Sequence, residues 1–306
     1  MNRIALLAFV AGLLAVSCAH DLDIQRGVVF AEPGGKRLQM NLYERPDDGQ
    51  GLRPGMVLIH GGAWLFGPRT QHWWFCHEFA RRGYVVMTID YRMLPMHHFP
   101  DCVYDCKAGV RWMRLHAAEY RIDPDRIVTF GASAGGHLAG FLAATDPEDG
   151  FEGTENPGPS SEVQAAVCLY GAMDLSKYRD PPHWNLLSPL GKRYIGWLVR
   201  DAGAATGQDP FDAGSPITYL KPDTCPVFLA HGTSDWIVHH KQSEAFHERL
   251  EALGVPTELH LYSHRNHGFD YIHYKQRRRM FEKMMRFLDQ YIGPAEPECA
   301  EAPIER

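Results

Sequence analysis

The chain has 306 residues, of which 45% are hydrophobic and 22% are charged. This composition supports a sizeable core and excludes an intrinsically disordered chain, and the length fits one large domain or two small ones, of which we favour one. The formal net charge of −6 gives no reason to expect nucleic acid or an anionic membrane surface as a partner.

The N-terminus has the pattern of an export signal. Arg3 precedes an apolar stretch over residues 4–16, which is shorter than the ~20 residues of a membrane-spanning helix and suits the core of a signal peptide over residues 1–19. Small residues precede Cys18, as in a bacterial lipobox, so lipidation of Cys18 and ordinary cleavage near Ala19 both stay open. Either way, the sequence predicts an exported bacterial protein that is periplasmic, secreted or held at a membrane by a lipid anchor.

Strand-like and helix-like segments alternate along the rest of the chain. Strands are expected at residues 27–31, 38–43, 56–59, 84–89, 127–130, 165–169, 227–230 and 258–262, and helices at 73–82, 101–120, 136–144, 243–254 and 274–291. The alternation predicts an α/β fold over residues 20–293, with a mostly parallel sheet covered by helices on both faces. Residues 178–219 are too many for a simple crossover, so a small, partly helical cap is expected there, and residues 294–306 are expected to form a disordered tail.

The cysteines do not predict a metal site. Cys102 and Cys106 are four residues apart on an expected helix, a spacing rarely used for a disulfide, and Cys168 and Cys225 belong in or beside apolar strands as buried thiols. Because no CxxC pair or Cys/His cluster has zinc spacing, we expect neither a metal nor a cofactor.

A short glycine-bracketed run carries the strongest chemical signal. Gly131-Ala132-Ser133-Ala134-Gly135 joins the expected strand at 127–130 to the expected helix at 136–144. Small residues allow a tight strand-to-helix turn that exposes the serine oxygen at the carboxyl edge of the sheet and at a helix N-terminus. This pattern predicts that Ser133 is a nucleophile; the alternative is a glycine-rich helix start that packs on the sheet.

A second glycine-rich segment follows the first buried strand. The backbone N–H groups of Gly61, Gly62 and Ala63 can turn towards a tetrahedral oxyanion, with the N–H of Ala134 as a further donor. The competing interpretation of this segment is an ordinary turn.

The base and its orienting acid are sought from chain order. Where a nucleophilic serine stands at a strand-to-helix turn of this kind, the acid and then the histidine follow it along the chain. Asp235 lies just after the strand at 227–230, and His267 lies in the loop after the strand at 258–262. His264 is the rival base, although it lies nearer the end of the strand. The acidic competitors are Asp90, which precedes the serine, and Asp105, while His231, His239 and His240 are expected to be structural or to line the rim.

These motifs together resemble the α/β-hydrolase esterases of the hormone-sensitive-lipase-like and acetyl-xylan/feruloyl esterase-like (BD-FAE-like) groups. The resemblance runs from about residue 56 to residue 291. It is carried by His60-Gly61-Gly62-Ala63-Trp64, Asp90-Tyr91-Arg92-Met93-Leu94-Pro95, Phe99-Pro100 with Asp105, Asp123-Pro124-Asp125-Arg126-Ile127, the serine run with Gly136-His137-Leu138-Ala139, Ser215-Pro216, His231-Gly232 with Asp235, and His267-Gly268-Phe269.

The resemblance implies a serine hydrolase that cleaves carboxylic esters, including acetyl or feruloyl groups linked to polysaccharide, without a cofactor. Ala63 stands where many lipase-like relatives have a third glycine, so its methyl group is expected to narrow the acyl site. The motifs also look like those of arylformamidases, and a non-catalytic hydrolase fold used for binding is a further alternative. Aromatic residues that could line the pocket are Trp64, Phe66, Trp73, Trp74, Trp184 and Trp236.

Overall fold

The computed structural model describes residues 22–46, 49, 51–179 and 188–295. Three predictions therefore fall outside the described residues: the export signal with Cys18, part of the expected cap with Trp184, and the tail from residue 296 onward.

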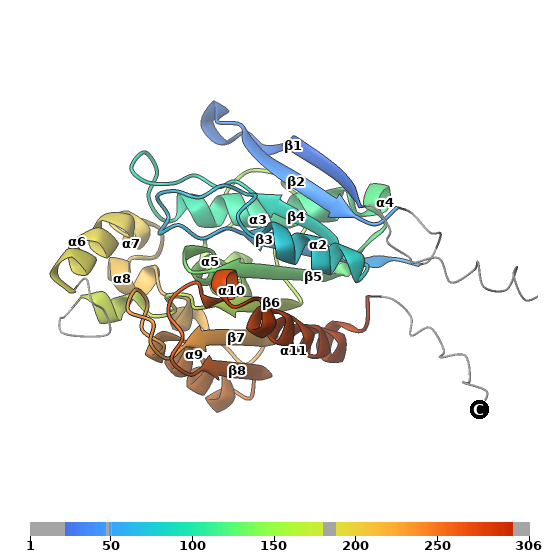
Figure 1. The fold of residues 1–306 in the computed structure, drawn as a ribbon. Coiled ribbons are helices and arrows are strands. Elements are labelled where there is room, and N and C mark those ends of the chain that lie inside the picture. Colours follow the sequence, from blue (N-terminus) through green and yellow to red (C-terminus); the bar gives the residue numbers. More distant parts are fainter. Residues whose placement is uncertain (1–21, 47–48, 50, 180–187, 296–306) are drawn as a thin grey trace, which may run out of the picture.

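An eight-stranded sheet forms the centre of the molecule (Figure 1). Its strand order is β1-β2-β4-β3-β5-β6-β7-β8. The strands β1 and β2 pair antiparallel, as do β2 and β4, and the remaining neighbours are parallel. The bounds are β1 Asp23–Ala31, β2 Leu38–Glu44, β3 Arg53–Ile59, β4 Val85–Ile89, β5 Ile122–Ala132, β6 Ala165–Leu169, β7 Val227–Gly232 and β8 Thr257–Tyr262.

Helices cover both faces of the sheet, as predicted. The apolar side chains of α3, α5 and α9 pack on one face, and those of α2 and α11 pack on the other. Successive strand residues alternate between the two cores: Val57 faces the first and Leu58 the second, because side chains along a strand point to opposite faces. The bounds are α2 Trp73–Arg81, α3 Asp101–Leu115, α4 Ala117–Tyr120, α5 Ala134–Ala144, α9 Lys241–Ala252, α10 Phe269–Ile272 and α11 Tyr274–Ile292.

Most expected elements are present with bounds shifted by no more than four residues, and two differ more from the prediction. The strand expected at 127–130 extends to Ile122–Ala132, because Ile122 and Asp123 also pair with β3, before a register shift at residues 124–126. The helix expected over 101–120 is divided at His116, whose φ of −101° and ψ of 13° separate α3 from α4. Arg121 then ends α4 in the left-handed region, with a φ of 55°.

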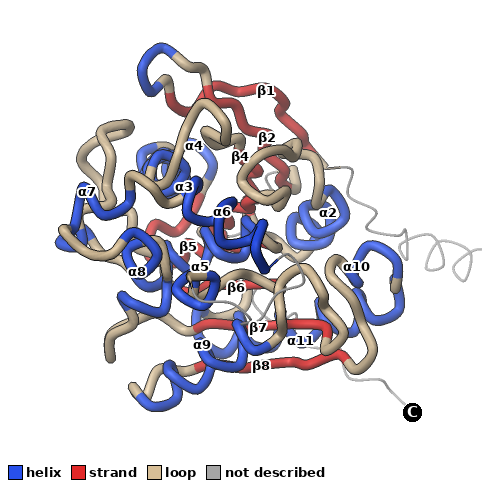
Figure 2. The backbone as a smooth tube through the Cα atoms, turned by 90° about the vertical axis from the view of Figure 1, so that its left-hand side faces the viewer, coloured by secondary structure: helices blue, strands red, loops and turns tan. Residues whose placement is uncertain are grey.

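The segment between β6 and β7 forms short helices at the carboxyl end of the sheet. They are α6 Ser188–Leu198, α7 Ala202–Thr206 and α8 Pro210–Ala213. Figure 2, which looks towards this end, shows α6 in front of the sheet near α5. Since the carboxyl ends of β3, β5, β6, β7 and β8 meet here, the loops after them share one edge.

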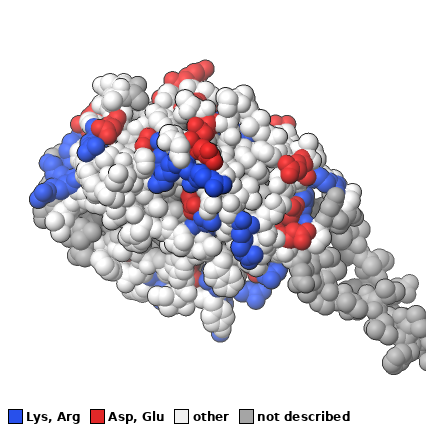
Figure 3. All heavy atoms as spheres, turned by 90° about the horizontal axis from the view of Figure 1, so that it is seen from above, with Lys and Arg blue, Asp and Glu red and all other residues white. Residues whose placement is uncertain are grey.

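Basic and acidic side chains are intermixed over much of the face shown in Figure 3. No helix among the described residues combines the length and apolar character needed to cross a bilayer. Within the same residues the cysteines are free thiols: Cys76, Cys102, Cys106 and Cys168, all buried, and Cys225, which is partly buried.

Candidate active site

Ser133 lies at the turn between β5 and α5, in a strained backbone conformation with a φ of 58° and a ψ of −121°. A conformation of this kind costs a non-glycine residue of order 1–3 kcal/mol and persists only when its surroundings enforce it. Two glycines make the turn possible. A Cβ atom on Gly131 would lie 2.0 Å from the carbonyl oxygen of Gly135, and one on Gly135 would lie 2.1 Å from that of Ile59.

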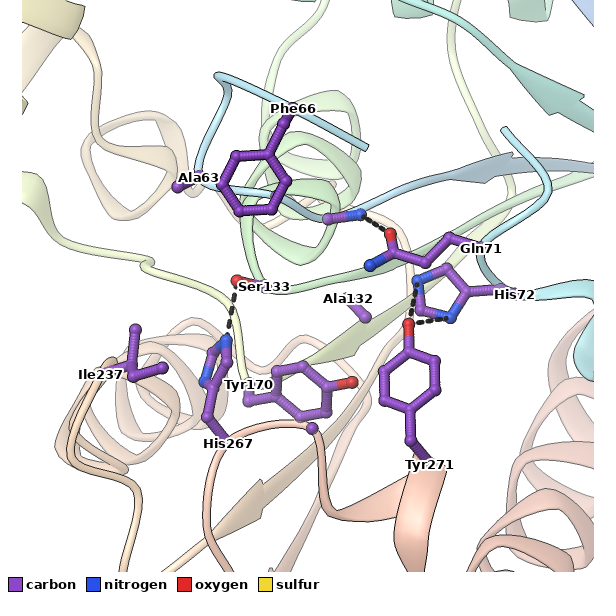
Figure 4. A pocket seen from close by; sticks show the side chains of 13 residues that line it. Ala63, Phe66, Gln71, His72, Ala132, Ser133, Tyr170, Ile237, His267 and Tyr271 are labelled. Atoms are coloured by element: carbon purple, nitrogen blue, oxygen red, sulfur yellow. Dashed lines mark hydrogen bonds between the residues drawn. The ribbon is translucent and has the colours of Figure 1, made fainter. Parts of the chain in front are cut away.

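The structure brings His267 to Ser133 from the loop after β8. The Ser133 hydroxyl lies 2.8 Å from His267 Nε2, a bond drawn in Figure 4. The ring of Tyr170 packs edge-on against the imidazole, with 4.7 Å between the ring centroids. Since an imidazole nitrogen that accepts the hydroxyl proton is the arrangement needed to activate a serine, this pair can act as nucleophile and base.

Asp235, in the loop after β7, holds the other side of the imidazole. Its Oδ2 accepts a hydrogen bond from His267 Nδ1 at 2.6 Å, and its Oδ1 accepts bonds from the backbone N–H groups of Ile237 and Val238, each at 2.9 Å. Burial raises the pKa of the Asp235 carboxyl, but the hydrogen bonds from His231 and His267 outweigh that effect and leave its pKa well below the ordinary value. Asp235 is therefore a buried carboxylate that stays ionised.

His231 is closer to the site than the sequence suggested. It is fully buried, and its Nε2 lies 3.2 Å from the same Asp235 oxygen that His267 contacts and 2.9 Å from the carbonyl oxygen of Val238. Its Nδ1 accepts a bond from the Ser243 hydroxyl at 2.8 Å. The sequence contained a signal for the contact between His231 and Asp235, because His231 lies at the end of β7 and Asp235 follows four residues later.

The segment after β3 presents free N–H groups beside Ser133. The Gly61 carbonyl accepts a bond from His60 Nδ1 at 2.7 Å, and the Gly62 carbonyl accepts bonds from the N–H groups of Leu65 and Phe66, each at 3.0 Å. Each peptide group is planar and trans, so the N–H that follows a bonded carbonyl points the opposite way. Within the described part of the chain, the N–H groups of Gly62 and Ala63 have no hydrogen-bond partner, and neither has the N–H of Ala134.

Backbone strain and a side-chain contact hold this segment in place. Ala63 and Trp64 have positive φ values of 53° and 55°, which are uncommon for residues other than glycine. The hydroxyl of Tyr194, on α6, donates a hydrogen bond to the Ala63 carbonyl. A backbone kept in this conformation can offer preorganised donors to a developing negative charge.

One expected donor must be corrected. The N–H of Gly61 donates to Gln71 Oε1 at 2.8 Å and is therefore not available to an oxyanion, although Gly61 does line the cavity beside Ser133. Gln71 lies ten residues further along the chain, and no motif in the sequence indicated its role.

Two cavities meet at Ser133, Ala63 and Ile237. We call the first, of about 220 Å³, the histidine-side cavity (Figure 4). Its remaining lining residues are Gly61, Gly62, Phe66, Gln71, His72, Ala132, Tyr170, His267, Gly268 and Tyr271. The second, of about 240 Å³, is the α6-side cavity, and its remaining lining residues are Trp64, Ala134, Ala172, Tyr178, Leu190, Gly191, Tyr194, Ile195 and Val238.

The predicted aromatic contacts divide between these cavities, the core and the surface. Trp64 is buried and lines the α6-side cavity, and Phe66 lines the histidine-side cavity. Trp74 packs against Phe281 on α11. Trp236 is 51% exposed and lines neither cavity, so the structure does not support it as a substrate contact, and Trp73 is exposed at the start of α2.

The competing candidates have other partners. His264 is exposed, and its backbone N–H donates to Thr233 Oγ1 at 3.0 Å. Asp90 forms an ion pair with Arg69 at 2.6 Å, and Asp105 pairs with Arg92 at 2.9 Å. The rings of His239 and His240 stack on each other, and neither residue lines a cavity at Ser133. No group of three or more His, Cys, Asp or Glu side chains among the described residues is arranged to hold a metal ion.

Comparisons with known proteins agree with this fold. The BD-FAE family model matches residues 40–250. The chain is 35% identical over 241 residues to the probable carboxylic ester hydrolase LipM of Mycobacterium tuberculosis, covering 77% of this chain and 52% of that protein. It is 30% identical to esterase LipQ of the same organism, covering 90% of this chain and 63% of that protein. The chain thus spans between half and two thirds of the length of these relatives.

A solved structure gives the same fold over nearly its whole length. The butyrate-bound esterase Est2 of Thermogutta terrifontis superposes with a TM-score of 0.73 and 28% sequence identity, covering 90% of this chain and 96% of that one. With the match to the family model and the parallel sheet described above, these similarities establish that the chain belongs to the BD-FAE family of α/β-hydrolases.

Proposed function

We propose that this protein hydrolyses carboxylic esters, with Ser133 as nucleophile, His267 as general base and acid, and Asp235 as the group that orients the imidazole. The observation that carries the proposal is the continuous hydrogen-bond chain from Ser133 Oγ through His267 to Asp235, with distances of 2.8 and 2.6 Å. The relatives named as esterases support the same reaction class.

The reaction follows from this chain of groups. Ser133 Oγ attacks the ester carbonyl while its proton moves to His267 Nε2, and the carbonyl oxygen becomes an oxyanion near the N–H groups of Gly62, Ala63 and Ala134. When the tetrahedral intermediate collapses, the carbon–oxygen bond to the alcohol breaks and His267 returns the proton to the leaving oxygen. Water then repeats the sequence on the acyl-enzyme and releases the acid.

The two cavities support one placement of the two halves of the ester. His267 must reach the leaving oxygen to protonate it, so the alcohol moiety belongs in the histidine-side cavity that His267 lines. The acyl group then occupies the α6-side cavity, whose walls include Trp64, Tyr178 and Tyr194. A chemical group the size of a water molecule occupies about 30 Å³. The α6-side cavity, at about 240 Å³, therefore accommodates an acetyl group with space to spare.

The acyl groups that we propose are acetyl and feruloyl groups carried on polysaccharide. The aromatic walls of the α6-side cavity suit the planar ring of a feruloyl group. The export pattern around residues 1–19, with lipidation of Cys18 as one form, supports an environmental substrate of this kind. Replacing Cys18→Ser tests the anchor: membrane association of the full chain should be lost, and its persistence would exclude lipidation at Cys18.

Hydrolysis of a short p-nitrophenyl ester tests the reaction, and a panel of acetylated xylan, methyl ferulate and N-formylkynurenine tests the substrate class. Ser133→Ala should remove the activity, because the remaining groups lack a nucleophile. Ser160→Ala, which removes an exposed hydroxyl from the loop before β6, serves as the matched control and should retain it. Full activity in Ser133→Ala would overturn the mechanism, and preferential cleavage of N-formylkynurenine would favour an arylformamidase.

A further inference from the structure

We propose that Gln71 selects the alcohol half of the substrate by donating a hydrogen bond from its side-chain amide to an oxygen on that alcohol. The proposal rests on the proposed ester hydrolysis and on the assignment of the histidine-side cavity to the alcohol. It predicts a preference for alcohols that carry an ether, hydroxyl or carbonyl oxygen a few bonds from the ester, over alkyl alcohols of the same shape.

The orientation of the Gln71 amide follows from its partner. The N–H of Gly61 is a donor, so the atom that meets it at 2.8 Å must be the amide oxygen. Rotating the amide by half a turn would place two donors against each other. The NH₂ group is therefore directed away from Gly61, and Figure 4 shows it pointing into the histidine-side cavity on the side of Ser133.

The other polar side chains around this cavity are already engaged. The Tyr271 hydroxyl lies 3.0 Å from Nδ1 of His72, and the Tyr170 hydroxyl donates to Asp270 at 2.7 Å. Burial lowers the pKa of His72 to about 3, so its ring is neutral and can accept the Tyr271 proton. The NH₂ group of Gln71 is a lining donor for which the described residues provide no acceptor.

An unpaired donor in a cavity discriminates between substrates. An alkyl alcohol that fills the histidine-side cavity removes water from the Gln71 NH₂ group and gives it no acceptor, whereas an alcohol with a suitably placed oxygen replaces the lost water. Phe66, Ala132 and Ile237, which also line this cavity, are apolar and offer the NH₂ group no acceptor. Selection at this position therefore depends on a single hydrogen bond.

The experiment compares two esters of one acid that differ by one atom in the alcohol: the 2-methoxyethyl ester, which carries an ether oxygen, and the n-butyl ester, which has a methylene group at that position. The measured quantity is the ratio of kcat/KM for the first ester to that for the second. Gln71→Glu keeps an oxygen for the Gly61 N–H and replaces the NH₂ donor by an acceptor, and Gln71→Met removes both groups at similar length. In each variant the ratio should fall about two- to twelvefold, the range expected for one neutral hydrogen bond.

The ratio in each variant is compared with the ratio in the wild type, so the difference in intrinsic reactivity between the two esters cancels. Tyr194→Phe, which alters the α6-side cavity, is the control and should keep the wild-type ratio. An unchanged ratio in Gln71→Glu, or in Gln71→Met where the first variant does not fold, would overturn the role of Gln71. An equal fall of the ratio in Tyr194→Phe would also overturn the role of Gln71. Failure of the wild-type protein to hydrolyse either ester would instead overturn the proposed function.

Discussion

The contact between α6 and the segment after β3 allows a specific test of how the oxyanion donors are held. Tyr194 donates its hydroxyl hydrogen to the Ala63 carbonyl. Burial raises the pKa of Tyr194 to about 12, so the hydroxyl keeps its proton throughout the pH range of an esterase assay. Tyr194→Phe removes this bond and retains the ring that lines the α6-side cavity.

The size of the effect is limited by the bond that is lost. A neutral hydrogen bond contributes about 0.5–1.5 kcal/mol net, which corresponds to about a two- to twelvefold change in the population of the correctly placed backbone. Ala63, with its φ of 53°, has a strained conformation to relax from once the tether is gone. We therefore expect kcat to fall about two- to twelvefold, less than the ~10²–10³-fold loss that follows removal of a whole oxyanion donor. KM should change little, because the donors act on the transition state.

Steady-state hydrolysis of a p-nitrophenyl ester gives both constants. Tyr219→Phe is the matched control: it removes a buried tyrosine hydroxyl that donates to the Ala213 carbonyl at 3.0 Å, outside both cavities at Ser133. It should lower Tm slightly and leave kcat at the wild-type value. A raised KM with an unchanged kcat in Tyr194→Phe would show that Tyr194 contacts only the acyl group, and a loss of kcat beyond ~100-fold would place its hydroxyl among the reacting atoms.

Three further predictions concern the acid, the serine turn and a buried carboxyl. Asp235→Asn should lower kcat about 10⁴-fold, because the amide no longer selects the correct tautomer of the imidazole; activity within tenfold of wild type would contradict that role. Gly135→Ala should destabilise the fold by about 1–3 kcal/mol or more and lower Tm, since the added Cβ would lie 2.1 Å from a backbone oxygen. In the control Gly140→Ala the added Cβ meets the flexible side chain of Met173, so this variant should unfold at a Tm closer to that of the wild type. Burial raises the pKa of Asp270 above its ordinary value of 3.8, so its charge destabilises the folded state increasingly as pH rises from about 4. Asp270→Asn should therefore raise Tm more at pH 8 than at pH 4, and a difference independent of pH would refute this explanation.

Local patterns were sufficient to predict the sheet and the turn around Ser133. The apolar run at β3 and the small residues of the serine turn each act through neighbours in the chain, so their conformation can be inferred without knowledge of distant contacts. The same logic failed where pairing across the sheet mattered: β5 begins five residues earlier than its apolar run, because β3 provides a partner for Ile122.

The sequence by itself determined the fold class, the tight turn at Ser133 and the order in which Asp235 and His267 follow it along the chain. Only the tertiary structure decided that Gly61 donates to Gln71, that His231 shares the Asp235 carboxylate, and that Trp64 lines a cavity while Trp236 is exposed. The physical reason is that the first group depends on backbone geometry and periodic burial. The second depends on hydrogen bonds and packing between separate loops, which exist only once the strand ends have met at one edge of the sheet.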